Sequence, residues 1–420
     1  MKLKGLWKHS DFMKLWTGQT ISMFGAQVTA LALPLVAAIT LKASAFEMGL
    51  LTAIGYLPYI LFSLFIGVWV DQFYRKPLMI ITDLVRGFAL LTIPIAAWQD
   101  FMTFELLCTV SFIVGTASVI FDIAYMSYLP SIVKTDELIE GNSKLEFSNS
   151  ASQISGQTIG GGLVQLLTPP IAMLCDGISF FVSAFTLLII RKKEEKPSNP
   201  DPQQNVIGNI KEGLKFVFGN PILSRITIST GLFNLSGLIM ESIYILYVTR
   251  ELDLSPLVLG IIFSVGGVGA MVGAAVAEKA AKLFSLGRTL YLMLIASGVF
   301  YYLVITTEAL PTAVTVGLLM IVQFMDAATV VIYNINQRSL RMAITPDHMQ
   351  GRMNASMRFI IFGSIPIGAL LGGLVGELFG AQLTIAFGAT GMVIAGLFIA
   401  ASPISKLKEI PPLKEEVAAS

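Results

Sequence analysis

A short charged turn separates two long apolar runs in the first quarter of the chain. It reads Gly67-Val68-Trp69-Val70-Asp71-Gln72-Phe73-Tyr74-Arg75-Lys76, with apolar runs over about 46–70 and 78–98 on either side. A helix needs roughly 20 apolar residues to cross the hydrocarbon core of a bilayer, where no backbone group can be left unpaired. Each run therefore predicts one membrane-spanning helix, and the turn predicts a return at the membrane surface.

The same pattern continues along the whole chain. Of the 420 residues, 55% are hydrophobic and 13% are charged, whereas a soluble domain carries roughly a quarter charged residues. This composition argues against a soluble enzyme and predicts an all-α integral membrane protein with twelve transmembrane helices. The twelve apolar runs cover about residues 15–41, 46–70, 78–98, 104–128, 147–168, 170–190, 223–249, 256–277, 289–306, 311–333, 356–379 and 382–402.

Lysine and arginine decide the orientation of these helices, because cytoplasmic loops carry an excess of both residues. With the N-terminus placed inside, only Lys42 and Arg250 fall on the outer side, and all other basic residues fall on the inner side. This asymmetry predicts a multi-pass protein of the bacterial inner (cell) membrane with both termini in the cytoplasm.

A long polar break divides the chain into two halves. It begins with Arg191-Lys192-Lys193-Glu194-Glu195-Lys196, contains several prolines, and ends in a stretch where apolar residues recur at helical spacing. We interpret it as a linker followed by a short amphipathic helix on the inner membrane surface. The predicted parts are an N-terminal six-helix bundle (1–190), the cytoplasmic linker (191–222), a C-terminal six-helix bundle (223–402) and a cytoplasmic tail (403–420).

The two halves also resemble each other at a constant offset. Gly49 recurs as Gly260, Asp136 as Asp347, and Gly161-Gly162-Leu163-Val164 as Gly372-Gly373-Leu374-Val375, each 211 positions later. Such matches are common one by one between glycine-rich membrane helices, but a shared offset indicates a duplication. Duplicated six-helix halves with a substrate site between them are typical of rocking transporters.

The turn quoted above resembles the cytoplasmic loop signature of the major facilitator superfamily, which has a glycine, an aspartate four residues later and a basic pair after four more. The matching residues are Gly67, Asp71, Arg75 and Lys76. The resemblance implies a gating loop, in which Gly67 permits close helix packing and Asp71 pairs with a basic group or faces a helix N-terminus. The alternative is an ordinary positive-inside turn with one acid.

Other stretches narrow the resemblance to the macrolide-efflux and drug-exporter branch of that superfamily, and the likeness spans nearly the whole chain. It implies two pseudo-symmetric six-helix bundles, export of amphipathic compounds such as macrolides or other drugs, and proton antiport. Asp83 and Arg86 are grouped here with the gating loop. The stretches are Leu15-Trp16 with Gly18-Gln19, Ser22 and Gly25; Asp83 with Arg86; Ile154 to Gly162; Asp176-Gly177-Ile178-Ser179-Phe180; and Gly351-Arg352-Met353-Asn354-Ala355.

Glycines concentrate in the fifth predicted helix and at the corresponding place in the eleventh. They resemble the glycine-rich motif of drug–proton antiporters, which implies a flexible, close-packed seam between the halves. Ordinary packing of small residues explains them equally well. The residues concerned are Gly156, Gly160, Gly161, Gly162, Gly372 and Gly373.

Four acidic residues lie inside predicted membrane helices, where an ionised group is costly unless it faces a cavity or a partner. An apolar environment favours the neutral form of a carboxyl group, so these residues are predicted to carry protons or to line a cavity. They are Asp326, Glu241, Asp122 and Asp176. For Asp122 the alternative is pairing with an arginine of the inner surface. For Asp176 it is a helix-start position favoured by the helix dipole.

Polar and aromatic side chains on four predicted helices are expected to line a substrate cavity. They are Gln19, Phe24, Gln27, Tyr56, Tyr59, Asn234 and Gln323. The 18 methionines and 27 phenylalanines would suit a pocket for varied apolar ligands, because methionine adapts its shape. Lipid contact and core packing are the simpler explanation for most of them.

The sequence argues against several classes of protein. It contains no G-x-x-x-x-G-K-[ST] loop for ATP, and its two cysteines and two histidines are too dispersed for a metal site. The net charge of +1 gives no nucleic-acid signal.

We therefore expect no enzyme activity, no cofactor and no metal. We expect a monomer whose partners are the lipid bilayer, a small amphipathic substrate and protons. The alternatives are export of an endogenous siderophore or peptide antibiotic, a non-transporting membrane sensor and a membrane-embedded enzyme.

Overall fold

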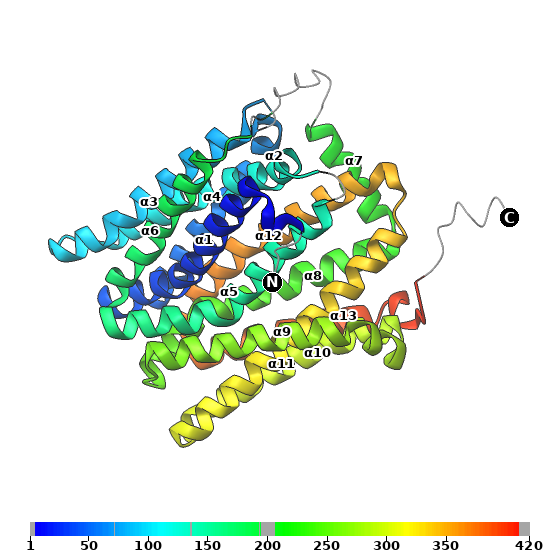
Figure 1. Ribbon diagram of the computed structural model, residues 1–420. Helices are drawn as coiled ribbons and strands as arrows, with labels where there is room; N and C mark the ends of the chain where they lie inside the picture. Colours follow the sequence, from blue (N-terminus) through cyan, green and yellow to red (C-terminus); the bar gives the residue numbers. More distant parts are fainter. Residues whose placement is uncertain (1–4, 71, 135–136, 193, 195–205, 411–420) are drawn as a thin grey trace. The chain divides into compact units, whose positions relative to one another are not determined.

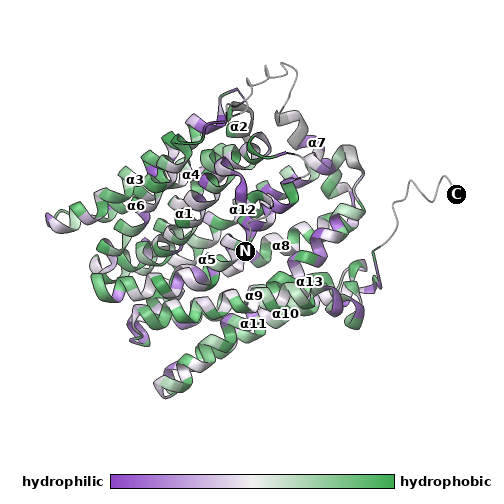
Figure 2. Ribbon diagram, viewed as in Figure 1, coloured by the Kyte–Doolittle hydropathy of each residue, from purple (hydrophilic) through white to green (hydrophobic). Residues whose placement is uncertain are grey.

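The computed structural model describes residues 5–70, 72–134, 137–192, 194 and 206–410, with the backbone alone at 63–65, 67–69, 206–207, 209–210 and 347–348. Every regular element in these ranges is helical, and they contain no strand (Figure 1). Eleven of the described helices are long and apolar enough to cross a bilayer. Apolar residues occupy most of the length of these helices (Figure 2). The predicted fold class, an all-α integral membrane protein, is confirmed.

The fifth predicted span (147–168) corresponds to α5 (Leu138–Leu167), which does not belong to those eleven helices. Its 30 residues are long enough to span a bilayer, but its N-terminal half carries Lys144, Glu146 and Asn149. The prediction started this helix at 147, nine residues after its observed start at Leu138. Hydropathy marks the apolar part of a helix, whereas backbone hydrogen bonds continue the helix into polar sequence.

Other helices also extend into polar sequence beyond their predicted bounds, two of them most of all. The tenth predicted run stops at 333, but α11 (Thr312–Ala343) continues to Ala343. The eleventh predicted run starts at 356, but α12 (Asp347–Phe379) starts at Asp347. The added turns contain most of the charged residues of these helices, including Arg341 and Arg352.

The helices form two compact units that are not contiguous in sequence. Unit 1 comprises residues 1–43, 54–203 and 254–264, and unit 2 comprises 44–53, 204–253 and 265–420. In unit 1, α6 packs against α1 and α3, and α4 packs against α3. Its elements are η1 (Gly5–Lys8), α1 (Ser10–Leu35), the π-helical η2 (Val36–Thr40), most of α2 (Ala45–Val70), α3 (Arg75–Trp98), α4 (Phe104–Ile132), α5 (Leu138–Leu167), α6 (Pro169–Leu188) and the first turns of α9 (Pro256–Phe284).

Unit 2 repeats this arrangement with the second half of the chain. Its α13 packs against α8 and α10, and α11 packs against α10. The predicted amphipathic helix of the linker is present as α7 and packs against α12. The elements are α7 (Val206–Gly219), α8 (Pro221–Leu246), the π-helical η4 (Tyr247–Glu251), most of α9 (Pro256–Phe284), α10 (Leu286–Ile305), η5 (Thr307–Ala309), α11, α12, α13 (Ala381–Ala400) and η6 (Pro403–Lys406).

Irregular backbone features confirm the internal repeat. The five-residue π-helices η2 and η4 both follow the first long helix of their half, at the predicted offset. A residue with positive φ follows each of them, Lys42 at 53° and Asp253 at 49°. Single residues of positive φ also join the last two helices of each half, Thr168 at 90° and Gly380 at 81°. Since such backbone is uncommon outside glycine, its recurrence indicates a duplicated fold.

Candidate functional site

The carboxylate of Asp326 on α11 is held by two hydroxyl groups of α10. Ser297 donates a hydrogen bond to Asp326 Oδ1, and the Tyr301 hydroxyl donates to Oδ2 at 3.2 Å. Ser297 and Tyr301 are buried, and Asp326 is half-buried. The part of the chain that the structure describes contains no basic side chain paired with Asp326. Both oxygens of this membrane-embedded acid therefore depend on neutral donors.

Glu241 on α8 lies within electrostatic range of the same group. The Glu241 side chain is exposed, and the acidic group with which it interacts electrostatically is the carboxyl group of Asp326. Tyr244, one turn later on α8, lies beside Gln323 of α11. Unit 2 thus brings together the predicted residues Glu241, Gln323 and Asp326 from two helices. Asn234 is half-buried on α8, two turns before Glu241.

In unit 1, Asp122 on α4 meets a predicted cavity residue. The Tyr59 hydroxyl on α2 donates to Asp122 Oδ2 at 3.1 Å, and the Tyr59 ring lies 6.3 Å from that of Tyr56. Asp122 is exposed, and the cation that acts on it is Arg86 of α3. The predicted alternative for Asp122 was an arginine of the inner surface. Its arginine neighbour is Arg86, which lies inside the helix bundle and not at that surface.

Asp83 and Arg86 do not lie in the connecting turn with which they were grouped. They lie more than two turns inside α3, pair with each other, and are 0% and 6% exposed. The Arg86 guanidinium lies between the rings of Phe121 on α4 and Phe180 on α6, 4.2 Å from each centroid. The sequence could not show this, because burial depends on how α3, α4 and α6 pack.

Asp176 is also buried in unit 1, at 1% exposure. It lies about two turns into α6, so the helix-start interpretation is wrong. Ser179 donates to Asp176 Oδ1 at 3.0 Å, and Gly25 of α1 packs so closely that a Cβ there would lie 2.6 Å from the same oxygen. Close contact of α1 with α6 seals this acid from solvent.

The glutamines of α1 are engaged in helix contacts. Gln19 is 4% exposed and donates to Ser183 of α6 at 3.0 Å, so it does not line an open cavity as predicted. Gln27 is half-buried and accepts from Gln157 of α5 at 3.2 Å, and Phe24 is half-buried one turn before it. Tyr56 lines a small cavity of about 180 Å³ between α1, α2, α3 and α4.

Most of the predicted packing glycines of α5 and α12 lie at close helix contacts within each unit. A Cβ at Gly156 or Gly160 would lie 2.7 Å or 3.1 Å from atoms of α1, and one at Gly161 would overlap the Pro256 carbonyl oxygen of α9. Gly162 has ordinary space, with its nearest neighbour at 3.7 Å. Gly372 packs against Ile239 of α8, and Gly373 against Ala45 and Gly49 of α2. Each unit therefore packs a glycine-rich helix against the start of a helix from the other half of the sequence.

The basic pair of the predicted gating loop contacts the start of the linker. The carboxylate of Glu194 accepts from the backbone N–H groups of Arg75 at 2.8 Å and Lys76 at 3.2 Å, at the N-terminus of α3. The Lys76 ammonium donates to the carbonyls of Leu188 and Ile190 at 3.0 Å and 2.8 Å. Gly67 lies in α2, whose last residue is Val70. Asp71 lies outside the described residues.

Sequence reasoning missed the acidic side chains that hold this linker. Glu194 is one, and Asp11 of α1 is the other: it accepts from the backbone of Arg191 at 3.2 Å and Lys192 at 3.0 Å. Lys192 in turn donates to the Ile132 carbonyl at the end of α4 at 3.0 Å. The charge run at 191–196 was the only signal, and it did not indicate which helix ends these residues contact.

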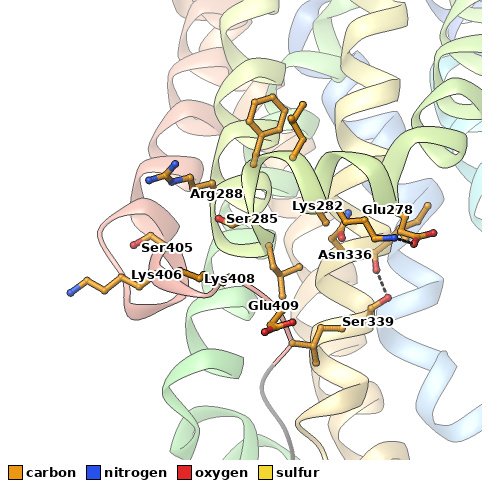
Figure 3. A pocket seen from close by; sticks show the side chains of 16 residues that line it. Glu278, Lys282, Ser285, Arg288, Asn336, Ser339, Ser405, Lys406, Lys408 and Glu409 are labelled. Atoms are coloured by element: carbon orange, nitrogen blue, oxygen red, sulfur yellow. Dashed lines mark hydrogen bonds and ion pairs between the residues drawn. The ribbon is translucent and has the colours of Figure 1, made fainter.

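An open cavity of about 970 Å³ in unit 2 contains none of the predicted site residues. It lies where α9, α10 and α11 approach the segment after α13 (Figure 3). Lys282 pairs there with Glu278 at 2.5 Å, whereas Arg288 and Lys406 point away from that pair. Among the described residues, no group of three or more His, Cys, Asp or Glu side chains could hold a metal ion.

Comparison with known proteins connects these features to transport. A family model described as transmembrane secretion effector matches residues 6–416. An uncharacterized MFS-type transporter of Bacillus subtilis is 23% identical over 83% of this chain and 82% of its own. The multidrug efflux pump Tap of Mycolicibacterium fortuitum is 24% identical over 87% and 89%. Macrolide efflux protein A of Streptococcus pyogenes is 25% identical over 50% and 51%.

Solved structures share the fold at low sequence identity. A bacterial homologue of the iron transporter ferroportin, in an inward-facing state, matches with a TM-score of 0.77 at 15% identity, over 96% of this chain and 100% of its own. A nucleoside transporter matches with a TM-score of 0.76 at 13% identity, over 95% and 100%. These likenesses extend to the architecture alone.

Proposed function

Because this chain belongs to the transmembrane secretion effector family of the major facilitator superfamily, we propose that it exports small amphipathic compounds by proton antiport. In this proposal the two units alternate access to the two sides of the bacterial inner membrane, and proton influx drives export. Macrolide-type and other drugs are the proposed substrates, on the basis of the efflux proteins to which the chain is similar.

One observation carries the proton part of the proposal: the Asp326 cluster of unit 2. An acid inside a membrane helix is costly, and such residues commonly act in proton relays. Ser297 and Tyr301 bind both oxygens of Asp326 without supplying a positive charge, so a proton is the simplest neutralising partner. Glu241, exposed and within range of Asp326, is proposed to receive either the proton or a cationic group of the substrate.

The membrane potential is large enough to drive such a step. One proton moving inward gains about 2.3 kcal/mol per 100 mV, before any contribution from a pH gradient. For an uncharged substrate at 100 mV, an exchange of one proton per substrate therefore supports more than a tenfold concentration gradient, since tenfold corresponds to about 1.4 kcal/mol. For a substrate with one positive charge the same exchange moves no net charge, so the pH gradient must drive it.

The test is uptake of a labelled macrolide and of a cationic dye into inverted vesicles, with and without an imposed pH gradient. Uptake driven by the gradient is expected for the unmodified chain, and equal uptake without the gradient would exclude proton antiport. Asp326→Asn is expected to lower gradient-driven uptake at least about tenfold, the equivalent of about 1.4 kcal/mol.

Glu278→Gln is the matched control for that variant. It makes the same change from acid to amide on an exposed side chain at the surface of α9, whose one ion-pair partner among the described residues is Lys282. It should leave uptake unchanged at equal protein level. If Asp326→Asn and Glu278→Gln behave alike, Asp326 is not the proton carrier.

A further inference from the structure

Unit 1 buries a single guanidinium among three acids. Arg86 pairs with Asp83 on α3, and it is also the basic residue that acts electrostatically on Asp122 of α4 and Asp176 of α6. If all three carboxyl groups were ionised, the cluster would carry two uncompensated negative charges. Such an excess is strongly unfavourable in a membrane-embedded bundle, so the cluster is expected to hold protons.

The pairing of Arg86 with Asp83 is incomplete. Asp83 Oδ2 and Arg86 Nε are buried and have no hydrogen-bond partner among the described residues. An arginine and a carboxylate frequently form two parallel hydrogen bonds, which would use both of these atoms. The one-point contact therefore leaves Arg86 with hydrogen-bonding capacity for a second acceptor. The rings of Phe121 and Phe180 both pack against the guanidinium, with each centroid 4.2 Å from its carbon, and so hold Arg86 beside α4 and α6.

Asp122 is the acceptor that can change its charge. Asp83 and Asp176 are 0% and 1% exposed, whereas Asp122 is exposed. Asp122 lies next to Phe121, one of the two rings that contact Arg86. Its other partner is the Tyr59 hydroxyl at 3.1 Å. Of the three acids, Asp122 is therefore the one whose side chain the packing of unit 1 leaves exposed.

We propose that unit 1 contains a second proton site, in which Arg86 is shared between Asp83 and Asp122. When Asp122 is ionised, Arg86 neutralises both carboxylates in part. When a proton binds a carboxylate oxygen of Asp122, an O–H bond forms and the full charge of Arg86 returns to Asp83. The titratable neighbours are Tyr59 from α2, Tyr125 from α4 and Asp176 from α6, while α1 contributes the neutral Gln19 and Thr29.

This site deepens the proposed function, because it gives proton antiport a carrier in each unit. Its test does not require transport. The purified full chain in lipid nanodiscs is titrated while infrared difference spectra record the C=O band of protonated carboxyl groups. A component of this band is expected to disappear in Asp122→Asn and to persist in Asp326→Asn.

The role of Arg86 is tested with the double variant Asp83→Asn/Arg86→Gln, which removes the buried pair as a unit. Removing the cation should move the Asp122 component to a titration midpoint at least about one pH unit higher, because a nearby positive charge favours the ionised acid. The proposal is overturned if Asp122→Asn leaves the band unchanged or if the double variant leaves the midpoint unmoved.

A third variant covers the case in which the double variant does not fold. Tyr59→Phe removes one hydrogen bond to Asp122 and no charge, and should raise the midpoint by a smaller amount. An unmoved midpoint in Tyr59→Phe would then count against Asp122 as the titrating group. Gradient-independent drug uptake together with a normal titration would refute the proposed function and leave this proton site standing.

Discussion

The third and sixth helices of each half meet at equivalent positions but with different chemistry. Arg86 on α3 and Ser297 on α10 occupy the same position counted from the helix start, and so do Phe180 on α6 and Met392 on α13. Arg86 lies 4.2 Å from the Phe180 ring centroid, and Ser297 Oγ lies 3.8 Å from Met392 Sδ. The duplicated backbone thus preserves the contact while the side chains have changed.

The two units balance the charge of their buried acids in different ways. Unit 1 places a cation beside its buried acids, whereas unit 2 gives Asp326 hydroxyl partners only. Removing one member of a buried ion pair leaves an uncompensated charge, but removing one hydroxyl leaves an acid that can bind a proton. Equivalent substitutions should therefore have unequal effects in the two units.

The largest effect is expected for Arg86→Ala. It leaves Asp83 buried and unpaired, and should lower the free energy of unfolding by about 3–5 kcal/mol. The equivalent Ser297→Ala removes one hydrogen bond and should cost about 1 kcal/mol. Thermal unfolding in detergent measures both. The double variant Asp83→Asn/Arg86→Gln should recover much of the loss. Equal losses for the two alanine variants would show that the two units do not differ in how they balance charge.

A smaller effect is expected at the glycine contacts, and there the two units should agree. Gly161→Ala would place a Cβ against the Pro256 carbonyl oxygen, and Gly372→Ala against that of Ile239. Overpacking of this kind costs about 1–3 kcal/mol. Gly162→Ala is the control, because its nearest neighbour is a Leu257 methyl at 3.7 Å. Measuring the free energy of unfolding of all three variants under the same conditions shows whether contact with a backbone oxygen determines the loss of stability.

The smallest effect is expected where the chain after the sixth helix of each half contacts the start of the third. In unit 1 the Glu194 carboxylate binds the N-terminus of α3. In unit 2 the carbonyls of Leu407 and Lys408 accept from the N-terminus of α10, at 2.9 Å and 3.1 Å. Glu194→Gln removes an anion from a helix N-terminus and should cost about 1 kcal/mol.

Lys408→Ala is the matched variant in unit 2 and should leave stability unchanged, because only its backbone takes part. Amide hydrogen exchange in the first turns of α3 and α10 measures both effects locally. Faster exchange in α10 of Lys408→Ala would show that the Lys408 side chain stabilises that helix start. Unchanged exchange in α3 of Glu194→Gln would show that the Glu194 charge does not stabilise its helix start.

Much of the fold was predictable, and the errors have a common origin. The apolar runs located all twelve long helices, and the offset of Gly49 from Gly260 predicted the repeat that η2 and η4 confirm. The starts of α5 and α12 were predicted too late, because hydropathy does not detect a helix that extends into polar sequence. The candidate site was less predictable. Asp122, Glu241 and Asp326 were singled out from sequence, and so were Tyr59 and Arg86. The sequence did not indicate that Tyr59 binds Asp122, nor that Ser297 and Tyr301 bind Asp326.

The sequence alone determined that this chain enters a bilayer, where its helices lie along the chain and that its halves are duplicates. These properties follow from hydrophobicity and spacing, which are summed along the chain without knowledge of neighbours. Only the tertiary structure decided that Arg86 lies between Phe121 and Phe180, that Asp326 binds Ser297 and Tyr301, and that Glu194 contacts α3. Those contacts depend on the rotation of each helix about its axis and on which helices pack together, and neither is encoded in any local stretch.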